Sequence, residues 1–535
     1  MKWNKIIAFT LAGAMTLSAL TGCSRGTGKE PAGTETVVKS GESGSEKNEG
    51  GAAAEIVDLE IWNVNDGFLE VKKGGALYNF YKDIIGVGLV SPYVEWNGGT
   101  TYQEQLNLRI ASGEMPDIFL PVNGMESDLI KNGALLDLTD LLPEKAPHLW
   151  ETIPEEVWDV IRSYDPSGEG RIYMIPSVVD YPMSGGIIRK DWLDNLGLSM
   201  PKTQEEYVEV LRAFKTQDPN GNGQADELPT GGRLEARWMD HLFSMYGIAM
   251  WEGNPQWDIY DGELTYSGVT RNMRDALLFI SELYKEGLMD QETLLNDKAA
   301  WEGKLASNKV GEYFHNAFTI NQKADAIYNA TGIKPDLEIV PPISAPGYEG
   351  FYTEKKSKAI QWVVKNTDDQ EKIDACMKVL DAYGNKDLWM KFFLGVEGMH
   401  SEMVDGELKL LPEDKKTMEN LLLLPAKEIS TVEGVTELLE AVKTDETAWS
   451  VDMAIANLKK MPEYGKLIAG DGIPNNIYDG YPDIMNRTLY VEYASKIIAG
   501  EYSIDKFDEF VEKWYASGGE AVTKAAREWY AKTQQ

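Results

Sequence analysis

The sequence predicts an α/β fold arranged as two lobes, on three observations. Short stretches in which apolar and polar residues alternate are followed repeatedly by longer stretches with helical spacing, a pattern typical of α/β lobes with largely parallel sheets. The chain has 535 residues, which is too many for one core of ordinary size. Its hydrophobic content of 43%, with 15 tryptophans and 25 tyrosines, is enough to bury a large core.

The first 54 residues predict targeting and a tether rather than a folded unit. Lys2 and Lys5 precede an apolar run over residues 6–20, which is too short for a comfortable membrane span. The run ends in Leu-Thr-Gly-Cys, which resembles the lipobox of bacterial lipoproteins, so residues 1–22 are expected to be a signal peptide and Cys23 to be acylated. An ordinary secretory signal with a chance cysteine is the alternative. Residues 23–54 have almost no apolar side chains and are expected to form a disordered tether.

Alternating strands and helices begin at residue 56. Val57, Leu59 and Ile61 alternate with acidic residues, which indicates a strand. Further strands are predicted over residues 116–120 and 171–176, with a helix over residues 102–110 between the first two that ends at Gly113.

The same alternation continues beyond residue 185. Residues 185–189 predict a strand that runs into a helix, and Thr203 followed by Glu206 forms a capping box at the start of the next helix. A helix over residues 273–284 is closed by Gly287. Strands are predicted over residues 309–315, 337–341 and 359–364, and the last third of the chain is predicted to be mainly helical.

Residues 218–227 predict a calcium loop. Ca²⁺ takes six to eight oxygen ligands at about 2.3–2.6 Å, and alternate residues of a tight loop can supply them. The EF-hand pattern is met only in part, because Pro229 stands where a bidentate Glu belongs, and a hydrophilic turn is the alternative. The expected role of the ion is structural, with Gln224 contributing its backbone carbonyl. The predicted ligands are Asp218, Asn220, Asn222, Gln224, Asp226 and Glu227.

Charge and composition exclude several classes of function. The formal net charge of −34 argues against binding to nucleic acid or to anionic lipid, and favours a neutral ligand over a polyanionic one. The four histidines lie far apart with no paired spacing, so a zinc site is not expected. Cys376 lies in a helical pattern and is expected to be a small core residue rather than a catalytic thiol.

Several short motifs, in their order and spacing, resemble one family. They are the Leu-Thr-Gly-Cys of residues 20–23, and residues 113–118, 172–176, 189–198, 201–207, 218–227 and 285–288. The chain resembles the extracellular solute-binding proteins of ABC importers, the family 1 sugar binders. Within that family it is most similar to the large Gram-positive lipoproteins and to the alginate-oligosaccharide binders that carry a bound calcium.

The resemblance implies a periplasmic-binding-protein type II fold, in which two α/β lobes are joined by crossover hinges and close on a ligand in the cleft between them. By that pattern the first lobe comprises residues 55–181 and 352–428, and the second comprises residues 182–351 and 429–535. The chain then crosses between the lobes near Pro182, Phe351 and Ile429.

A sugar cleft needs aromatic platforms and planar polar side chains, and the family pattern places ligand contacts in the loops that follow strand ends. Each aromatic candidate has an alternative role in the core. The ligand-binding candidates are Trp62, Asn65, Asn123 and Glu126 in the first lobe, and Trp238, His315, Asn316 and Trp449 in the second.

The resemblance implies a protein that captures an oligosaccharide or related carbohydrate outside the cell and delivers it to the permease of an ABC transporter. It would be a monomer, anchored through lipid at the extracellular face of the bacterial cell membrane, with Ca²⁺ as a structural cofactor. It is not expected to be an enzyme, since we find no nucleophile elbow, HExxH or Walker motif. Two alternatives stay open: a secreted polysaccharide hydrolase or lyase, and a solute receptor that feeds a sensor kinase.

Overall fold

The computed structural model describes residues 56–62, 70–94, 100–122, 124–404, 406–411 and 431–534. Five predictions fall outside these residues: the signal peptide with Cys23, the tether of residues 23–54, the ligand candidates Asn65 and Asn123, and the third crossing near Ile429. Within the described ranges, no helix is long and apolar enough to cross a membrane.

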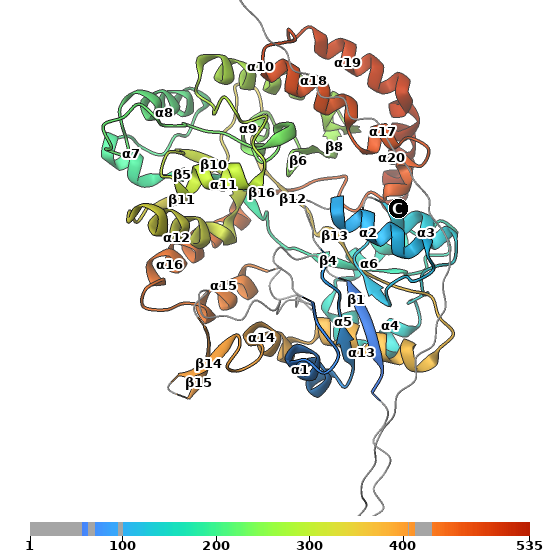
Figure 1. The fold of residues 1–535 in the computed structure, drawn as a ribbon. Helices are drawn as coiled ribbons and strands as arrows, with labels where there is room; N and C mark the ends of the chain where they lie inside the picture. The colour runs from blue at the N-terminus through green and yellow to red at the C-terminus, as the bar shows by residue number, and fades with distance from the viewer. Residues whose placement is uncertain are drawn as a thin grey trace, which may run out of the picture. The chain divides into compact units, whose positions relative to one another are not determined.

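A five-stranded sheet organises the first part of the chain (Figure 1). Its strands, in spatial order, are β2 (Gly88–Val90), β1 (Asp58–Trp62), β3 (Ile118–Phe119), β13 (Ser357–Val364) and β4 (Met174–Val178). β1 pairs parallel with β2 and β3, whereas β13 pairs antiparallel with β3 and β4. Only β13 therefore opposes the other strands, and the prediction of a largely parallel sheet is confirmed here.

The predicted strand over residues 171–176 begins three residues late, at Met174. The backbone N–H of Arg171 donates to the carboxylate of Asp165, and that of Ile172 donates to the hydroxyl of Thr139. Side chains thus take the backbone donors that a strand would use, which a strand pattern in the sequence does not reveal.

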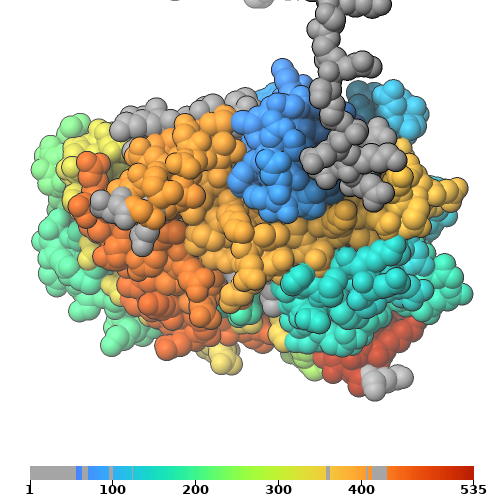
Figure 2. Space-filling view, turned by 90° about the horizontal axis from the view of Figure 1, so that it is seen from below, coloured from blue at the N-terminus to red at the C-terminus, as the bar shows by residue number. Residues whose placement is uncertain are grey.

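Helices pack on this sheet through one hydrophobic cluster, in which Ile61, Trp158 and Trp362 are fully buried. Cys376 is 2% exposed, so its predicted place in the core is confirmed. Figure 2 shows the N-terminal residues (blue) packed against the residues that follow β13 (gold and orange), where Phe80 contacts Phe392. The helices are α1 (Ala76–Ile85), α2 (Thr100–Ala111), α3 (Met125–Lys131), α4 (Leu141–Lys145), α5 (Pro147–Thr152), α6 (Glu155–Arg162), α13 (Gln370–Gly384) and α14 (Lys386–Leu394).

A three-stranded sheet organises the second part, in the order β10 (Glu312–Asn316), β5 (Ser184–Arg189) and β11 (Leu337–Ile339). Both outer strands run antiparallel to β5, so the prediction of parallel strands does not hold for this sheet. Gly186 of β5 lies so close to Glu312 that a Cβ atom would sit 2.9 Å from its carboxylate. The helices around this sheet are α7 (Lys190–Leu196), α8 (Gln204–Thr216), α9 (Asp240–Ser244), α10 (Arg271–Glu286), α11 (Lys298–Ala306) and α12 (Ile320–Thr331).

The predicted helix signals in this part are confirmed. The hydroxyl of Thr203 accepts a hydrogen bond from the backbone N–H of Glu206 at 3.2 Å, and the Glu206 carboxylate accepts one from Lys202 N–H at 2.8 Å. Helix α10 ends at Gly287, whose φ of 71° is the left-handed conformation that glycine adopts without strain.

The last third of the chain is mainly helical, as predicted, but it also contains short strands that were not foreseen. There, β14 (Ser401–Val404) and β15 (Glu407–Leu410) form a hairpin, and β16 (Gly465–Leu467) pairs with β12 (Tyr352–Glu354) from the middle of the chain. Two further hairpins in the middle of the chain are β6–β7 (Met250–Trp251, Asn254–Pro255) and β8–β9 (Trp257–Tyr260, Glu263–Tyr266). The helices are α15 (Val432–Ala441), α16 (Ala448–Leu458), α17 (Pro482–Met485), α18 (Thr488–Ile498), α19 (Lys506–Trp514) and α20 (Glu520–Thr533).

The chain passes between the two sheets at two described places. It leaves β4 at Val178 and enters β5 at Ser184, and it returns between Glu354 of β12 and Ser357 of β13. Buried residues change cluster at the same point, since Val178 belongs to the first cluster and Val179 to another. The lobe limits given above stay a prediction.

Candidate functional site

The three-stranded sheet ends next to the segments that connect it to the other sheet. Asn316, the last residue of β10, pairs with Ser184, the first residue of β5. The Ser184 hydroxyl donates to the side-chain oxygen of Asn316. Val340, which follows β11, donates its N–H to Gly186 near the same end of the sheet. Side chains that project from this end can therefore reach a ligand held beside the connections, in keeping with the rule for open α/β sheets.

Three aromatic side chains gather at this end, and we call them the aromatic stack: Trp238, Trp301 and His315. The imidazole of His315 stacks on Trp238 with ring centroids 4.6 Å apart, and on Trp301 with centroids 5.4 Å apart. They come from the turn before α9, from α11 and from β10. The structure thus brings together Trp238 and His315, both predicted from the sequence, and adds Trp301.

His315 is a neutral hydrogen-bonding group in this stack. Burial, followed by the charges of Lys323 and Arg233, holds its pKa well below the usual range. The hydroxyl of Thr319 donates to the carbonyl of Asn316, so it must accept the hydrogen bond that joins it to Nδ1 of His315 at 2.8 Å. Nδ1 therefore carries the proton, and Nε2 is left as an acceptor suited to a hydroxyl group.

Arg233 packs on the aromatic stack and is not among the candidates predicted from the sequence. Its guanidinium carbon lies 4.7 Å from the ring centroid of Trp238 and 4.1 Å from that of Trp301. Burial lowers its pKa to about 10. No local motif marks this residue, because its partners come from distant segments.

Glu126 is one of two described candidates in the predicted first lobe, and it contacts a segment near the C-terminus. It is 5% exposed, and it accepts a hydrogen bond of 2.9 Å from the amide of Asn475. Burial raises its pKa above the usual range. Lys131, at the end of the same helix α3, pairs with Asp479. Helix α3 and the turn of residues 475–479 are therefore joined by two polar contacts.

Trp62 and Trp449 lie apart from the aromatic stack. Trp62 is 3% exposed within the first hydrophobic cluster, where its indole N–H donates to Glu60 at 2.7 Å. Trp449, at the start of α16, packs edge-on against Tyr328, with Lys334 above its ring. Neither indole presents a free face at the end of the three-stranded sheet.

A buried carboxylate lies a short way from the stack, on α9. Asp240 is 3% exposed, and its Oδ1 accepts the N–H of Gly253 at 2.8 Å. Its Oδ2 has no hydrogen-bond partner among the described residues. Burial raises the pKa of Asp240 to about 7. It lines a small internal space with Trp251 and Glu252.

A larger cavity of about 550 Å³ lies between residues of α6, β8, β16 and α20. Of its charged side chains, Lys466 pairs with Asp258 at 2.7 Å and Lys356 pairs with Glu156 at 3.0 Å. Asp471 also lines the cavity and accepts the backbone N–H of Lys356 at 2.8 Å.

The acidic loop of residues 218–227 is held mainly by its own backbone. The carboxylate of Asp218 accepts the N–H groups of Asn222 and Gly223 at 3.1 and 2.9 Å. Asp218 has a φ of 48°, an uncommon value for a residue with a side chain. Asp226 pairs with Lys309 at 2.8 Å. Oδ1 of Asn220 accepts the N–H of Asn222 at 3.0 Å, and Oδ1 of Asn222 accepts the N–H of Gln224 at 2.7 Å, so four of the predicted ligands already carry partners from the protein.

Glu227 has no such partner for one of its oxygens. Its side chain is buried, and Oε1 has no hydrogen-bond partner among the described residues. Burial, and then the nearby charges of Asp226 and Asp218, raise its pKa. A buried carboxylate oxygen within reach of the charges of two further carboxylates is suited to a cation. In the part of the chain that the structure describes, however, no three His, Cys, Asp or Glu side chains are grouped so that they could hold a metal. A metal here would therefore depend on Asn220, Asn222 and backbone oxygens.

These features define a class of protein: an α/β protein built on two sheets that are joined by crossing segments. The chain belongs to the bacterial extracellular solute-binding proteins, whose family model matches residues 90–384. The predicted family and fold class are confirmed.

Known relatives agree with this assignment. Lipoprotein LipO of Bacillus subtilis (strain 168) is 26% identical over 453 residues, which cover 82% of this chain and 86% of that protein. The fructooligosaccharide ABC transporter substrate-binding protein FusA of Streptococcus pneumoniae serotype 4 is 29% identical over 276 residues, or 48% of each chain.

Solved structures show the same fold. Alginate-binding protein AlgQ2, in a crystal structure without calcium ion, matches with a TM-score of 0.66 at 21% identity, over 90% of this chain and 99% of that one. FusA in complex with kestose matches with a TM-score of 0.64 at 22% identity, over 89% and 99%.

Proposed function

We propose that this protein captures an oligosaccharide outside the cell and delivers it to the permease of an ABC transporter. The observation that carries the proposal is the aromatic stack at the end of the three-stranded sheet. Indole faces suit the apolar faces of sugar rings, and the acceptor nitrogen of His315 suits a hydroxyl. The relatives support it, since FusA was solved with kestose and AlgQ2 is an alginate-binding protein.

The ligand would be held between the two lobes, with closure about the segments near Pro182 and Phe351. Trp238, His315 and Asn316 would contact it from the second lobe. Asn65, Asn123 and Glu126 would contact it from the first, and Trp62 and Trp449 would support the neighbouring packing. The hydrogen bond between Glu126 and Asn475 supports closure, because these residues belong to different predicted lobes.

A thermal-shift and calorimetric screen against plant, host and bacterial oligosaccharides tests this function. A ligand that binds only the folded state raises the melting temperature by mass action. A sugar that raises it and is recovered unchanged supports capture. If the sugar is turned over, the protein is a hydrolase or lyase and the proposal is wrong.

The lipid anchor is part of the same proposal. A protein acylated at Cys23 and carried on the tether of residues 23–54 would stay beside its permease as a monomer. The similarity of this chain to LipO, which is a lipoprotein by name, supports the anchor. Cys23→Ser should release the protein from the membrane fraction or leave its precursor unprocessed, whereas unchanged processing and retention would contradict the anchor.

We also propose that the acidic loop binds one structural Ca²⁺. The unpartnered oxygen of Glu227 supports this, as does the existence of an EF-hand mutant of FusA, a protein of the same fold. The ion would supply positive charge between Asp218, Asp226 and Glu227, and side-chain oxygens of Asn220 and Asn222 and the carbonyl of Gln224 would complete the set. The loop is tied to α7 by Asn195, which donates to the carbonyl of Pro219 at 3.0 Å, so the ion would also order that contact.

A further inference from the structure

The guanidinium of Arg233 has one edge without partners. Its Nε and Nη2 atoms are both buried, and neither has a hydrogen-bond partner among the described residues. These two nitrogens point their hydrogens in parallel from one side of the group, which is the arrangement that holds a carboxylate through two hydrogen bonds. Leaving buried, charged donors unpaired costs free energy, so the empty edge needs an explanation.

Other arginines of this chain show what this edge binds. Arg212 holds Glu286 with Nε at 2.6 Å from one carboxylate oxygen and Nη2 at 2.9 Å from the other. Arg189 holds Asp191 in the same way, at 2.9 and 2.5 Å. Arg233 presents the same two atoms, but among the described residues it has no carboxylate on that edge.

The acidic residues near Arg233 are engaged elsewhere. Glu302 accepts the ammonium of Lys323 at 2.7 Å, and Glu252 lies 3.8 Å from the guanidinium of Arg237. Lys298, Lys323 and Arg233 all depress the pKa of His315, which places several cations around the aromatic stack. Although the chain has a net charge of −34, three cations thus surround the aromatic stack. A neutral ligand has no use for such charge.

The loop that carries Arg233 is rigidly held. The N–H of Gly232 donates to Thr293 at 2.6 Å, and the N–H of Leu234 donates to the carbonyl of Asn296. Glu235, Ala236 and Trp238 all have positive φ angles, near 60°, which is uncommon for residues with side chains. Strained backbone of this kind persists where the surroundings enforce it, and it gathers at binding sites.

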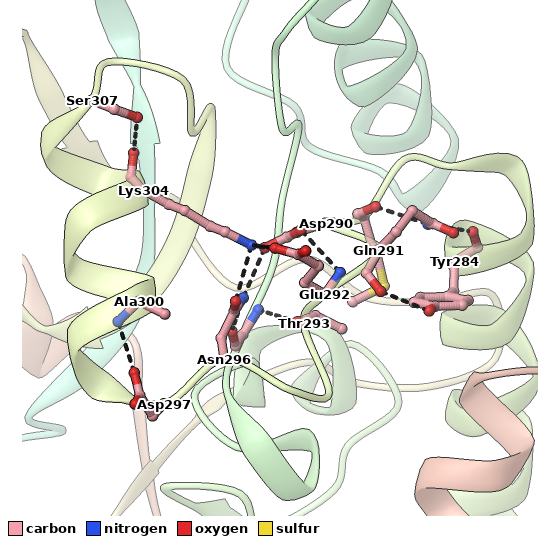
Figure 3. A network of polar contacts seen from close by, with 12 residues as sticks. Tyr284, Asp290, Gln291, Glu292, Thr293, Asn296, Asp297, Ala300, Lys304 and Ser307 are labelled. Atoms are coloured by element: carbon pink, nitrogen blue, oxygen red, sulfur yellow. Dashed lines mark hydrogen bonds and ion pairs between the residues drawn. The ribbon is translucent and has the colours of Figure 1, made fainter. Parts of the chain in front are cut away.

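A polar network fixes the two walls of the site to each other (Figure 3). Lys304 of α11 reaches the segment of residues 290–296 and donates to Asp290 at 2.6 Å, Glu292 at 2.8 Å and Asn296 at 2.9 Å. Asn296 supports the backbone of the Arg233 loop, and α11 also carries Trp301. The network therefore fixes the guanidinium relative to the indole that it stacks on, as a preorganised site requires.

We propose that Arg233 binds the carboxylate of an acidic sugar, held between its Nε–Nη2 edge and the aromatic stack. This rests on the proposed function and gives it a substrate class: an oligosaccharide that contains a uronic or sialic acid. The indoles limit the positions of the guanidinium, and the edge selects a planar group with two acceptor oxygens. Because the edge is buried, the ligand enters when the lobes are open and the carboxylate is enclosed on closure.

Matched probes and variants test this. Tri-galacturonate and its methyl ester share one carbohydrate backbone and differ only in charge; oligomannuronate and sialyllactose present the carboxylate in other settings, and kestose is a neutral reference. Arg233→Lys keeps the charge but loses the two-atom edge, and Arg233→Met keeps much of the packing. Arg271→Lys is the matched control, because the Arg271 side chain is 86% exposed. Calorimetry measures each affinity, and melting curves report folding.

We expect the wild-type protein to bind at least one acidic probe at least about tenfold more tightly than a matched neutral sugar, the usual effect of a charge-assisted two-point contact. Arg233→Lys and Arg233→Met should lose most of that preference while any neutral affinity and the melting temperature stay near wild type, and Arg271→Lys should change nothing. If Arg233→Lys binds the acidic probe as wild type does, Arg233 is only a packing residue. If kestose alone binds, the acidic-sugar proposal is wrong but capture of a sugar stands. If no sugar binds, both proposals fail.

Discussion

The acidic loop of residues 218–227 and the basic cluster, by which we mean Arg233 and the aromatic stack that it packs on, are close in sequence and opposite in charge. Each contains an ionisable group with buried atoms that have no hydrogen-bond partner in the described part of the chain: Oε1 of Glu227 in the loop, and Nε and Nη2 of Arg233 in the cluster. The loop draws its groups from ten consecutive residues, whereas the cluster draws them from the turn before α9, from α11 and from β10. Two sites that each hold a charge without a counterion can therefore differ in whether a sequence reveals them, because one is built from consecutive residues and the other from distant ones.

The largest losses of stability and of affinity are expected from a substitution within the aromatic stack. Trp301→Ala removes the indole over which both His315 and Arg233 lie, and the cavity left by a Trp that is 3% exposed should cost about 3–5 kcal/mol of unfolding free energy. Trp449→Ala is the control, since that half-buried indole lies apart from the stack. Denaturant unfolding and calorimetry with tri-galacturonate measure both effects. Equal losses of affinity in the two variants would show that the stack has no special part in binding.

The second prediction concerns the acidic loop and the sign of the stability change that a substitution there causes. Removing Ca²⁺ with a chelator should lower the stability of the wild-type protein, by about 3 kcal/mol when the free ion stands at 100 times its dissociation constant. Glu227→Gln should reverse in sign between conditions: it is destabilising with Ca²⁺, because a ligand is lost, and stabilising in chelator, because an unpartnered buried carboxylate becomes neutral. Melting curves of both proteins in both buffers measure this. If chelator leaves the wild-type curve unmoved and no metal co-purifies, the loop is only a turn.

The third prediction uses Asp240, a buried carboxylate. Because the pKa of Asp240 is raised from 3.8 to about 7, its contribution to stability is fully present below pH 3.8 and is lost as the pH rises through 7. Asp240→Asn removes that loss, so the variant should gain about 2–3 kcal/mol relative to wild type between pH 5 and pH 8. Urea unfolding at the two pH values measures the difference. Parallel pH profiles for the two proteins would contradict the neutral state of Asp240.

The smallest expected effect concerns lobe closure, which would bring a ligand on the cluster into contact with the first lobe. Small-angle scattering should show a smaller radius of gyration with a bound sugar than without one. Glu126→Ala should weaken sugar binding by about 1 kcal/mol, because it removes a hydrogen bond to Asn475 in the closed form. The change in melting temperature that chelator causes should be the same in this variant as in the wild-type protein. An identical scattering profile at saturating sugar would exclude closure.

The sequence by itself determined the features that depend on neighbouring residues. The capping box at Thr203, the glycine end of α10, the alternation that forms β1, the burial of Cys376 and the acidic loop all follow from spacing along the chain. The motif order was also sufficient to predict the family. Local hydrogen bonding and periodic burial act over a few residues, so these features are readable without the fold.

Only the tertiary structure decided which tryptophan serves which purpose. Trp62 and Trp238 are alike in sequence terms, since each has one apolar and one polar neighbour. Both are buried in hydrophobic clusters, but only Trp238 stacks on His315. The antiparallel pairing around β5 and the late start of β4 were likewise set by partners from elsewhere in the chain. Arg233 became visible only because folding places its free edge against indoles from distant segments, and desolvation of a charge is a property of the assembled surroundings rather than of the residue.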